Sequence, residues 1–194
     1  MRSLRTGRLR WVPLVLVTLF ITAAATAAGC SGRSAEKTIT VAMTGARTGD
    51  VAAWAEPQFQ AVQLAVDEFN AAGGVSKGPH KGAKIKIEIY DDKGDPKEAA
   101  NIAQKLAEDK NIFAVIGPVQ SSLNLAAGGI YEQANLTHLN TTGSNPKVTE
   151  QGWKKIFTIV INDAMLGPNL GRFIAQEFRN PRVAIFYQND DYGK

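Results

Sequence analysis

Ile112-Phe-Ala-Val-Ile-Gly-Pro-Val-Gln-Ser-Ser122 is the stretch of sequence that is most informative about the fold. Its first five residues are apolar throughout, which is typical of a parallel strand covered on both faces. The Gly-Pro pair ends the strand, and we expect a helix from Ser121 to about Ala134. A buried strand that leads directly into a helix indicates an α/β protein built on a parallel sheet.

The same alternation continues along the chain in both directions. Apolar residues at helical spacing lie around Phe59–Phe69, after Asp95-Pro96, and from Leu170 to Phe178. Strands are expected between these helices, at Thr38–Met43, Lys84–Tyr90, Leu136–Leu139, Lys155–Val160 and Val183–Tyr187. This β-α-β-α order implies right-handed crossovers, and ligands of such sheets bind beyond the carboxyl ends of the strands.

Three local patterns refine this prediction. The strict period of two in Lys84–Tyr90 predicts an edge strand with one wet face. Asp95 followed by Pro96 is typical of an N-cap and the first helical residue. We expect the pair Gly128-Gly129 to let its helix approach the sheet closely, and Val183–Tyr187 to be a buried strand.

The first 29 residues have the three-part layout of a secretory signal. A basic segment precedes the apolar run Trp11–Ile21, and small residues lead to Cys30, where a bacterial lipoprotein signal places its lipidated residue. We therefore expect a lipoprotein signal peptide at 1–29, acyl chains on Cys30 that anchor the protein, and a flexible tether at 30–36. A plain signal cut near Ala28 and an uncleaved anchor are the alternatives. The protein should be exported and lipid-anchored at a bacterial cell membrane, facing the periplasm or exterior.

Charge and residue counts exclude several classes of function. The chain has 22 basic and 18 acidic residues, but four of the basic ones are arginines of the leader. The remainder is neutral, so we expect no nucleic-acid partner. One cysteine and two histidines exclude a disulfide and a multi-cysteine or His-rich metal site. Asp91, Asp92 and Asp95 lack the spacing of a calcium loop and are expected in turns and caps, and His138 is expected to be structural.

Six motifs in order resemble the branched-chain amino-acid binding proteins of ABC transporters, within the periplasmic binding protein type I superfamily. They are Ala42–Gly45, Phe69–Val75, Tyr90–Pro96, Ile116–Ser122, Gly143–Pro146 and Arg182–Gly193, and together they span about residues 37–194. The resemblance implies two α/β lobes that close around a solute. It places lobe one at 37–160, and the crossover and the start of lobe two at 161–194. Because family members are longer, we expect this sequence to be a fragment or a truncated gene.

The resemblance also implies ligand-binding residues on the first lobe. The serine that matches Ser121 binds the ligand carboxylate, and Ser122 stands beside it at a helix start, where free N–H groups favour anions. The loop Thr142, Gly143 and Ser144 supplies a carbonyl to the ligand amine and a hydroxyl to its carboxylate. Ser121 is also expected to be the N-cap of the helix, a role compatible with ligand binding, with a plain N-cap as its alternative. An ordinary turn is the alternative for residues 142–144.

Three further residues complete the expected site. Trp54 matches an aromatic wall, Tyr192 matches an aromatic residue that closes over the ligand, and Asp163 matches an acid near the amine. The alternatives are a surface tryptophan for Trp54 and a helix N-cap or a polar hinge residue for Asp163.

The function implied is a solute-binding lipoprotein of an ABC importer, which captures an amino acid, an amide or a similar small polar solute by closure of its two lobes. Its expected partners are the permease and the ATPase. No Gly-x-Ser-x-Gly or Gly-x-Gly-x-x-Gly motif is present where catalysis or a nicotinamide cofactor would need it, so we expect neither an enzyme nor a cofactor. The sensing domain of a receptor and an exported α/β hydrolase are the alternatives.

Overall fold

The computed structural model describes residues 37–190 and 192–193. The predicted signal peptide, Cys30 and the tether lie outside the described residues. Among the residues described, no helix is long and apolar enough to cross a membrane.

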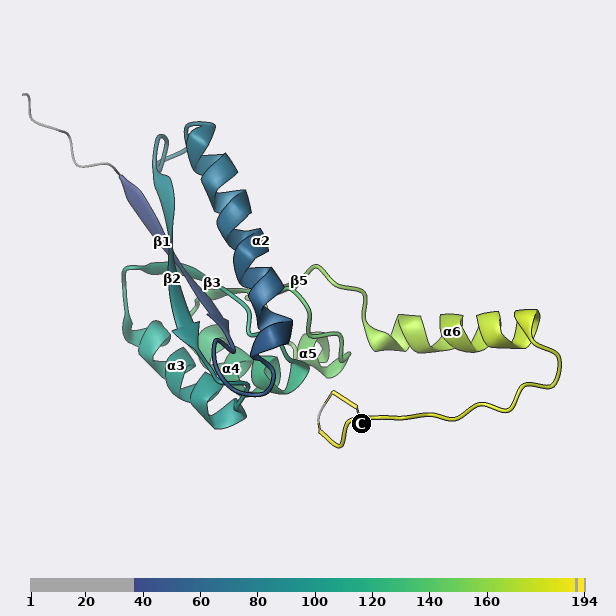
Figure 1. The fold of residues 1–194 in the computed structure, drawn as a ribbon. Helices are drawn as coiled ribbons and strands as arrows, with labels where there is room; N and C mark the ends of the chain where they lie inside the picture. The colour runs from purple at the N-terminus through teal and green to yellow at the C-terminus, as the bar shows by residue number, and fades with distance from the viewer. Residues whose placement is uncertain (1–36, 191, 194) are drawn as a thin grey trace, which may run out of the picture. The chain divides into compact units, whose positions relative to one another are not determined.

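Five parallel strands of the described chain form a sheet in the order β2-β1-β3-β4-β5 (Figure 1). Their bounds are β1 Thr38–Gly45, β2 Lys84–Asp91, β3 Ile112–Ile116, β4 Thr137–Asn140 and β5 Ile156–Thr158. The register of β1 on β2 runs without a break from Thr38 opposite Lys84 to Gly45 opposite Asp91. The edge position predicted for β2 and the parallel α/β fold are both confirmed.

Helices follow the strands as the alternation predicts. Their bounds are α2 Ala52–Ala71, α3 Pro96–Glu108, α4 Ser121–Gln133, α5 Lys147–Glu150 and α6 Asp163–Glu177. The predicted cap of α3 is confirmed, because the Asp95 carboxylate accepts a hydrogen bond of 2.8 Å from the Glu98 N–H and Pro96 is the first helical residue.

The core has two layers, one on each face of the sheet. Successive side chains of a strand point to opposite faces, so Ala42 and Met43 of β1 belong to different layers. Ala42 packs with residues of α3 and α4, including Leu106 and Tyr131. Met43 packs with Ala55 and other residues of α2 and its preceding loop. This double cover holds the carboxyl ends of β1 and β3 in fixed positions.

The glycine pair of α4 faces a different neighbour from the predicted one. A Cβ atom on Gly128 would lie 2.3 Å from Cζ3 of Trp153, while a Cβ on Gly129 would be 3.6 Å from the same ring. Gly128 therefore makes room for a tryptophan side chain, not for the sheet.

The buried strand predicted at Val183–Tyr187 is wrong. Residues 181–188 have no regular secondary structure, and Ile185 and Phe186 are 83% and 95% exposed. A strand needs a neighbour that completes its backbone hydrogen bonds, and the described residues provide none at this segment. The preceding helix α6 forms as predicted, but none of its residues is buried.

Candidate functional site

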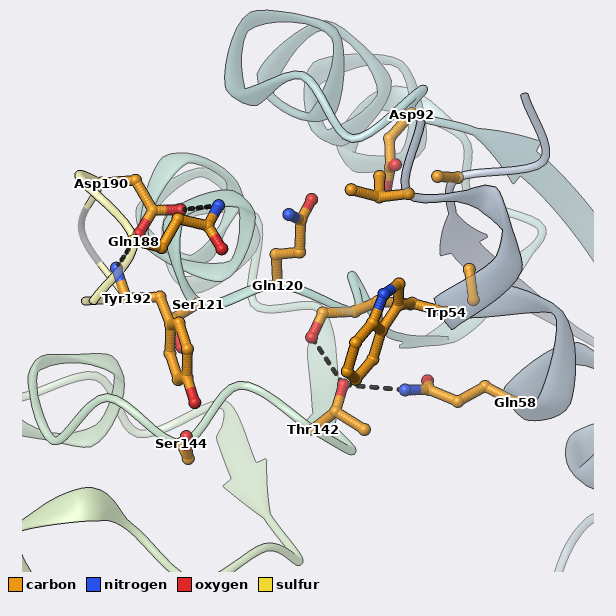
Figure 2. Close-up of a pocket in the computed structure, with 14 residues that line it drawn as sticks. Trp54, Gln58, Asp92, Gln120, Ser121, Thr142, Ser144, Gln188, Asp190 and Tyr192 are labelled. Atoms are coloured by element: carbon orange, nitrogen blue, oxygen red, sulfur yellow. Dashed lines mark hydrogen bonds between the residues drawn. The ribbon is translucent and has the colours of Figure 1, made fainter. Parts of the chain in front are cut away.

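A cavity of about 380 Å³ lies at the carboxyl ends of the strands, where ligands of parallel sheets bind (Figure 2). Four connecting segments, α2 and the first residue of α4 line it, together with three residues near the C-terminus. The lining residues are Ala46, Val51, Trp54, Ala55, Gln58, Asp92, Val119, Gln120, Ser121, Thr142, Ser144, Gln188, Asp190 and Tyr192.

Ser121 is the first residue of α4 and lines the cavity. The first N–H groups of a helix have no acceptor within the helix, so together with the helix dipole they favour an anion at this point. The Ser121 side chain is 2% exposed, and its oxygen accepts a hydrogen bond of 3.2 Å from the Asn145 N–H. Gln120, not Ser121, occupies the N-cap position, and its side chain makes no capping bond. The expectation that Ser121 is the N-cap is therefore wrong.

Ser122, the next residue, is not among the residues that line this cavity. It is 8% exposed and lines a neighbouring cavity that it shares with Lys93 and Gln120. The two cavities adjoin each other, because both are lined by Val51, Gln120, Gln188 and Asp190.

The buried amide of Asn140 organises the loop between β4 and α5. Its oxygen accepts hydrogen bonds from the N–H groups of Gly143 at 2.8 Å and Thr142 at 3.3 Å. Its nitrogen donates to the Gly143 carbonyl at 2.7 Å. Gly143 itself is buried behind the cavity, where an added Cβ would lie 2.9 Å from the Asn124 side chain. The structure therefore gives Gly143 a packing position and leaves the cavity to its two neighbours.

Thr142 and Ser144 both line the cavity, and each hydroxyl already has protein partners. The Thr142 hydroxyl donates to the Val119 carbonyl at 2.5 Å and accepts from the Gln58 amide at 2.8 Å. With its hydroxyl so engaged, Thr142 can offer its backbone carbonyl to a ligand amine.

Asp163 reaches the cavity only through Ser144. The Ser144 hydroxyl donates to its carboxylate at 2.9 Å, and the Asp163 N–H donates to the Ser144 carbonyl at 2.9 Å. The cap of α6 is Asn162, whose side chain accepts from the Met165 N–H, so the alternative assignment of Asp163 as N-cap is wrong.

Trp54 and Tyr192, the aromatic residues that the resemblance assigns to the site, both line the cavity. Trp54 projects from the first turns of α2 and is 79% exposed, and Tyr192 is half exposed (Figure 2). Small apolar side chains at Ala46, Val51 and Ala55 continue the wall that Trp54 begins.

Asp92 is a lining residue to which the sequence assigned only a turn. It is fully buried, and one carboxylate oxygen accepts a hydrogen bond of 3.0 Å from the Gly94 N–H. The other oxygen has no hydrogen-bond partner among the described residues. Burial raises the pKa of Asp92 to about 6. An acid at the end of an edge strand was the available signal, but its burial depends on the packing of α3 and α4.

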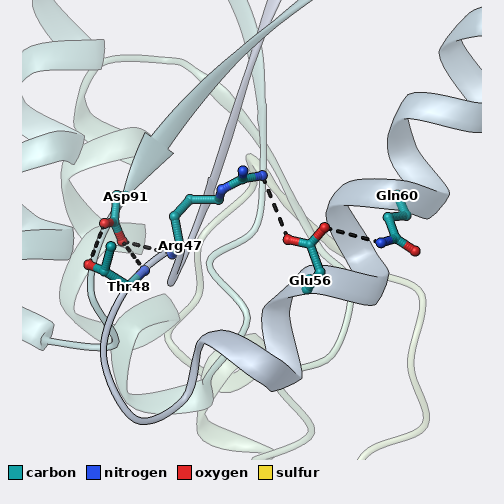
Figure 3. A network of polar contacts seen from close by, with 5 residues as sticks. All are labelled: Arg47, Thr48, Glu56, Gln60 and Asp91. Carbon is teal, nitrogen blue, oxygen red and sulfur yellow. Dashed lines mark hydrogen bonds and ion pairs between the residues drawn. The ribbon is translucent and has the colours of Figure 1, made fainter.

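The neighbouring Asp91 fixes the loop that leads to Trp54 (Figure 3). Its carboxylate accepts hydrogen bonds from the Arg47 N–H at 2.8 Å and from the Thr48 hydroxyl at 2.6 Å. Burial favours the neutral acid, but these bonds outweigh it and lower the pKa of Asp91. The Arg47 guanidinium contacts Glu56 at 3.7 Å and lies over the Phe59 ring, which ties the loop to α2 as well.

A helix start, a hydroxyl-bearing loop and aromatic side chains thus surround one cavity of a parallel α/β fold. Comparison with known sequences agrees, since residues 38–194 match the family described as periplasmic binding protein. The chain belongs to the periplasmic binding protein family.

Curated relatives and solved structures extend this result. The chain is 35% identical over 160 residues to the leucine-, isoleucine-, valine-, threonine-, and alanine-binding protein of Pseudomonas aeruginosa, covering 82% of this chain and 41% of that one. It is 33% identical to the Leu/Ile/Val-binding protein of Escherichia coli K12, covering 86% and 45%. The chain thus spans less than half the length of these relatives.

The chain also spans less than half the length of the solved structures that it matches. An ABC transporter substrate-binding protein of Desulfitobacterium hafniense in complex with Leu superposes with a TM-score of 0.68 at 28% identity, covering 81% of this chain and 44% of that one. A type 1 periplasmic binding protein of Bordetella pertussis gives a TM-score of 0.70 at 29% identity, covering 81% and 42%.

Proposed function

We propose that the protein captures an amino acid outside the cytoplasmic membrane and delivers it to an ABC permease and its ATPase. The observation that carries this proposal is the cavity at the start of α4, which pairs an anion-binding helix end with hydroxyls and an apolar wall. Among the described residues that line it there is no lysine or arginine, while Asp92 and Asp190 are present. A ligand with one carboxylate and one ammonium group suits this distribution of charge.

In the proposed complex the ligand carboxylate lies at the N–H groups of α4 and the Ser121 hydroxyl. The Ser144 hydroxyl accepts a hydrogen bond from the ligand ammonium group, because its single proton is donated to Asp163. The ammonium group lies at the Thr142 carbonyl, with Asp163 acting through Ser144. Trp54 and Tyr192 cover the ligand side chain. The names of the relatives support an amino acid as the ligand.

Ligand capture would occur by closure of two lobes, of which residues 37–160 supply the first. A ligand that contacts both lobes favours the closed state by the free energy of those additional contacts. We place the start of the second lobe at residues 161–194, which contribute Tyr192.

Calorimetric titration of the protein expressed from its own gene, with each of the standard L-amino acids in turn, tests this function. At least one of them should bind, and its decarboxylated amine should not bind, because the proposed site holds the carboxylate. Absence of binding by every amino acid would contradict the proposal.

We also propose export and lipidation at Cys30, which rest on the sequence alone. Cells fed a radiolabelled fatty acid should label the protein, and the Cys30→Ser variant should lose the label and appear in the soluble fraction. Equal labelling of both proteins would contradict lipidation.

A further inference from the structure

Gln58 joins α2 to the loop between β4 and α5, which lies far from it in the sequence. It lies one helical turn after Trp54 in α2, is half-buried, and lines the cavity. Its amide oxygen accepts a hydrogen bond of 2.7 Å from the Thr141 hydroxyl. Its amide nitrogen donates to the Thr142 hydroxyl at 2.8 Å (Figure 2).

A third hydrogen bond, from the Thr142 hydroxyl to the Val119 carbonyl, fixes the direction of these two bonds. The Thr142 hydroxyl donates its single proton to the Val119 carbonyl, so it can only accept from Gln58. The Thr141 hydroxyl donates, so it needs an acceptor. A carboxamide offers both groups at once, whereas a carboxylate only accepts and an aliphatic side chain does neither.

The three segments linked in this way carry the proposed ligand-binding groups. Trp54 lies on α2 beside Gln58, Ser121 follows Val119 by two residues, and Ser144 follows Thr142 by two residues. Asn140 holds the inner side of the β4–α5 loop, while Thr142 on its outer side is exposed and bonded to Gln58. Gln58 therefore fixes the spacing between the aromatic wall and the carboxylate site.

We infer that Gln58 is a positioning residue for ligand binding, which holds the Thr142 loop at a set distance from Trp54 and thereby determines affinity. This inference rests on the proposed function. Gln58 acts through the loop, so the loop itself must become more mobile when the two hydrogen bonds are lost, even with no ligand present.

The variants Gln58→Met and Gln58→Glu test this inference against Gln104→Met and Gln104→Glu, at an exposed glutamine of α3. Calorimetry with L-leucine and with any better ligand from the amino-acid series gives Kd. Hydrogen exchange in the ligand-free protein follows the amides of residues 142–144. Gln58→Met should raise Kd about tenfold and speed exchange at these amides, because two hydrogen bonds are lost. The Gln104 variants should change neither.

The Gln58→Glu variant should bind ligand with a Kd that depends on pH, which would not be expected if Gln58 only filled space. At about pH 7 its carboxylate cannot donate to Thr142, so Kd should rise as in Gln58→Met. As pH falls toward about 4.5 the carboxyl gains a proton and can donate and accept, so Kd should return toward the value of the unsubstituted protein at the same pH.

Unchanged Kd and unchanged exchange in Gln58→Met would overturn the inference. A Kd ratio for Gln58→Glu that is the same at every pH would overturn the hydrogen-bond account. If the unsubstituted protein binds no amino acid, the proposed function fails, and the exchange of residues 142–144 still decides whether Gln58 positions the loop.

Discussion

Burial shifts the pKa values of Asp92 and His138 in opposite directions. Asp92 is fully buried, and burial raises its pKa from 3.8 to about 6. His138 of β4 is 1% exposed with its ring against Tyr131, and burial lowers its pKa from 6.5 to about 4. The folded protein therefore holds a proton on Asp92 that the unfolded chain loses, and lacks a proton on His138 that the unfolded chain gains.

The stability of the protein should consequently depend little on pH between about 4 and 6, because the two effects offset each other. In this window Asp92 lowers the free energy of unfolding as pH rises, since the unfolded state has released its proton. His138 raises the free energy of unfolding as pH rises, since the unfolded state no longer binds the extra proton.

Substitution of either residue should leave the other one's effect on the pH dependence of the free energy of unfolding uncompensated. In Asp92→Asn the free energy of unfolding should rise with pH across this window, by an amount on the order of 2 kcal/mol. In His138→Gln it should fall with pH instead. Urea unfolding at a series of pH values measures both slopes, and parallel profiles for the two variants would contradict this account.

Adjacent serines at the start of α4 give a second prediction for single residues. Ser121→Ala should raise the ligand Kd about tenfold or more, because a hydrogen bond to a charged carboxylate is lost. Ser122→Ala should leave Kd within about twofold, because Ser122 lines the neighbouring cavity and not the one that Ser121 lines. Calorimetry on both variants, at a temperature where unfolding curves show each to be folded, distinguishes them. An equal loss in both would mean that the helix start matters and the Ser121 hydroxyl does not.

At the scale of elements, prediction from the sequence succeeds where the signals are local. The start of α3 was predictable to the residue because Asp95 and Pro96 act within their own turn. Strand Val183–Tyr187 was mispredicted because its apolar pattern is local but its hydrogen bonds depend on a neighbour. Gln58 was missed because its two threonine partners lie more than eighty residues away along the chain. No pattern within α2 indicates them.

The Gly128-Gly129 pair of α4 allows a matched test of element packing. Gly128→Ala should destabilise the protein by about 1–3 kcal/mol, because the new methyl group overlaps the Trp153 ring. Gly129→Ala should stabilise it by up to about 1 kcal/mol, because alanine favours a helix and meets that ring at ordinary contact distance. Urea unfolding measures both. Destabilisation by the two changes alike would show that α4 tolerates no side chain on this face.

At the scale of the whole molecule, apolar side chains accumulate near the C-terminus. In α6, Leu170 and Phe173 are 56% and 54% exposed, and Ile185 and Phe186 are more exposed still. Trp54, Leu64 and Phe113 are exposed as well, but most of the exposed large apolar side chains of the described residues lie from residue 157 onward. Adjoining exposed apolar residues are uncommon on a soluble monomer and favour association.

The 194-residue chain should therefore self-associate in a concentration-dependent way. Sedimentation velocity should show the mean sedimentation coefficient rising with concentration, and an apolar dye should fluoresce on binding. Phe186→Ser should weaken both effects because it removes the most exposed of these side chains. Leu64→Ser should leave them unchanged, because Leu64 is 61% exposed on α2, outside the C-terminal group. If the two variants reduced association equally, the driving force would be general surface hydrophobicity, and residues 163–187 would have no special part in it.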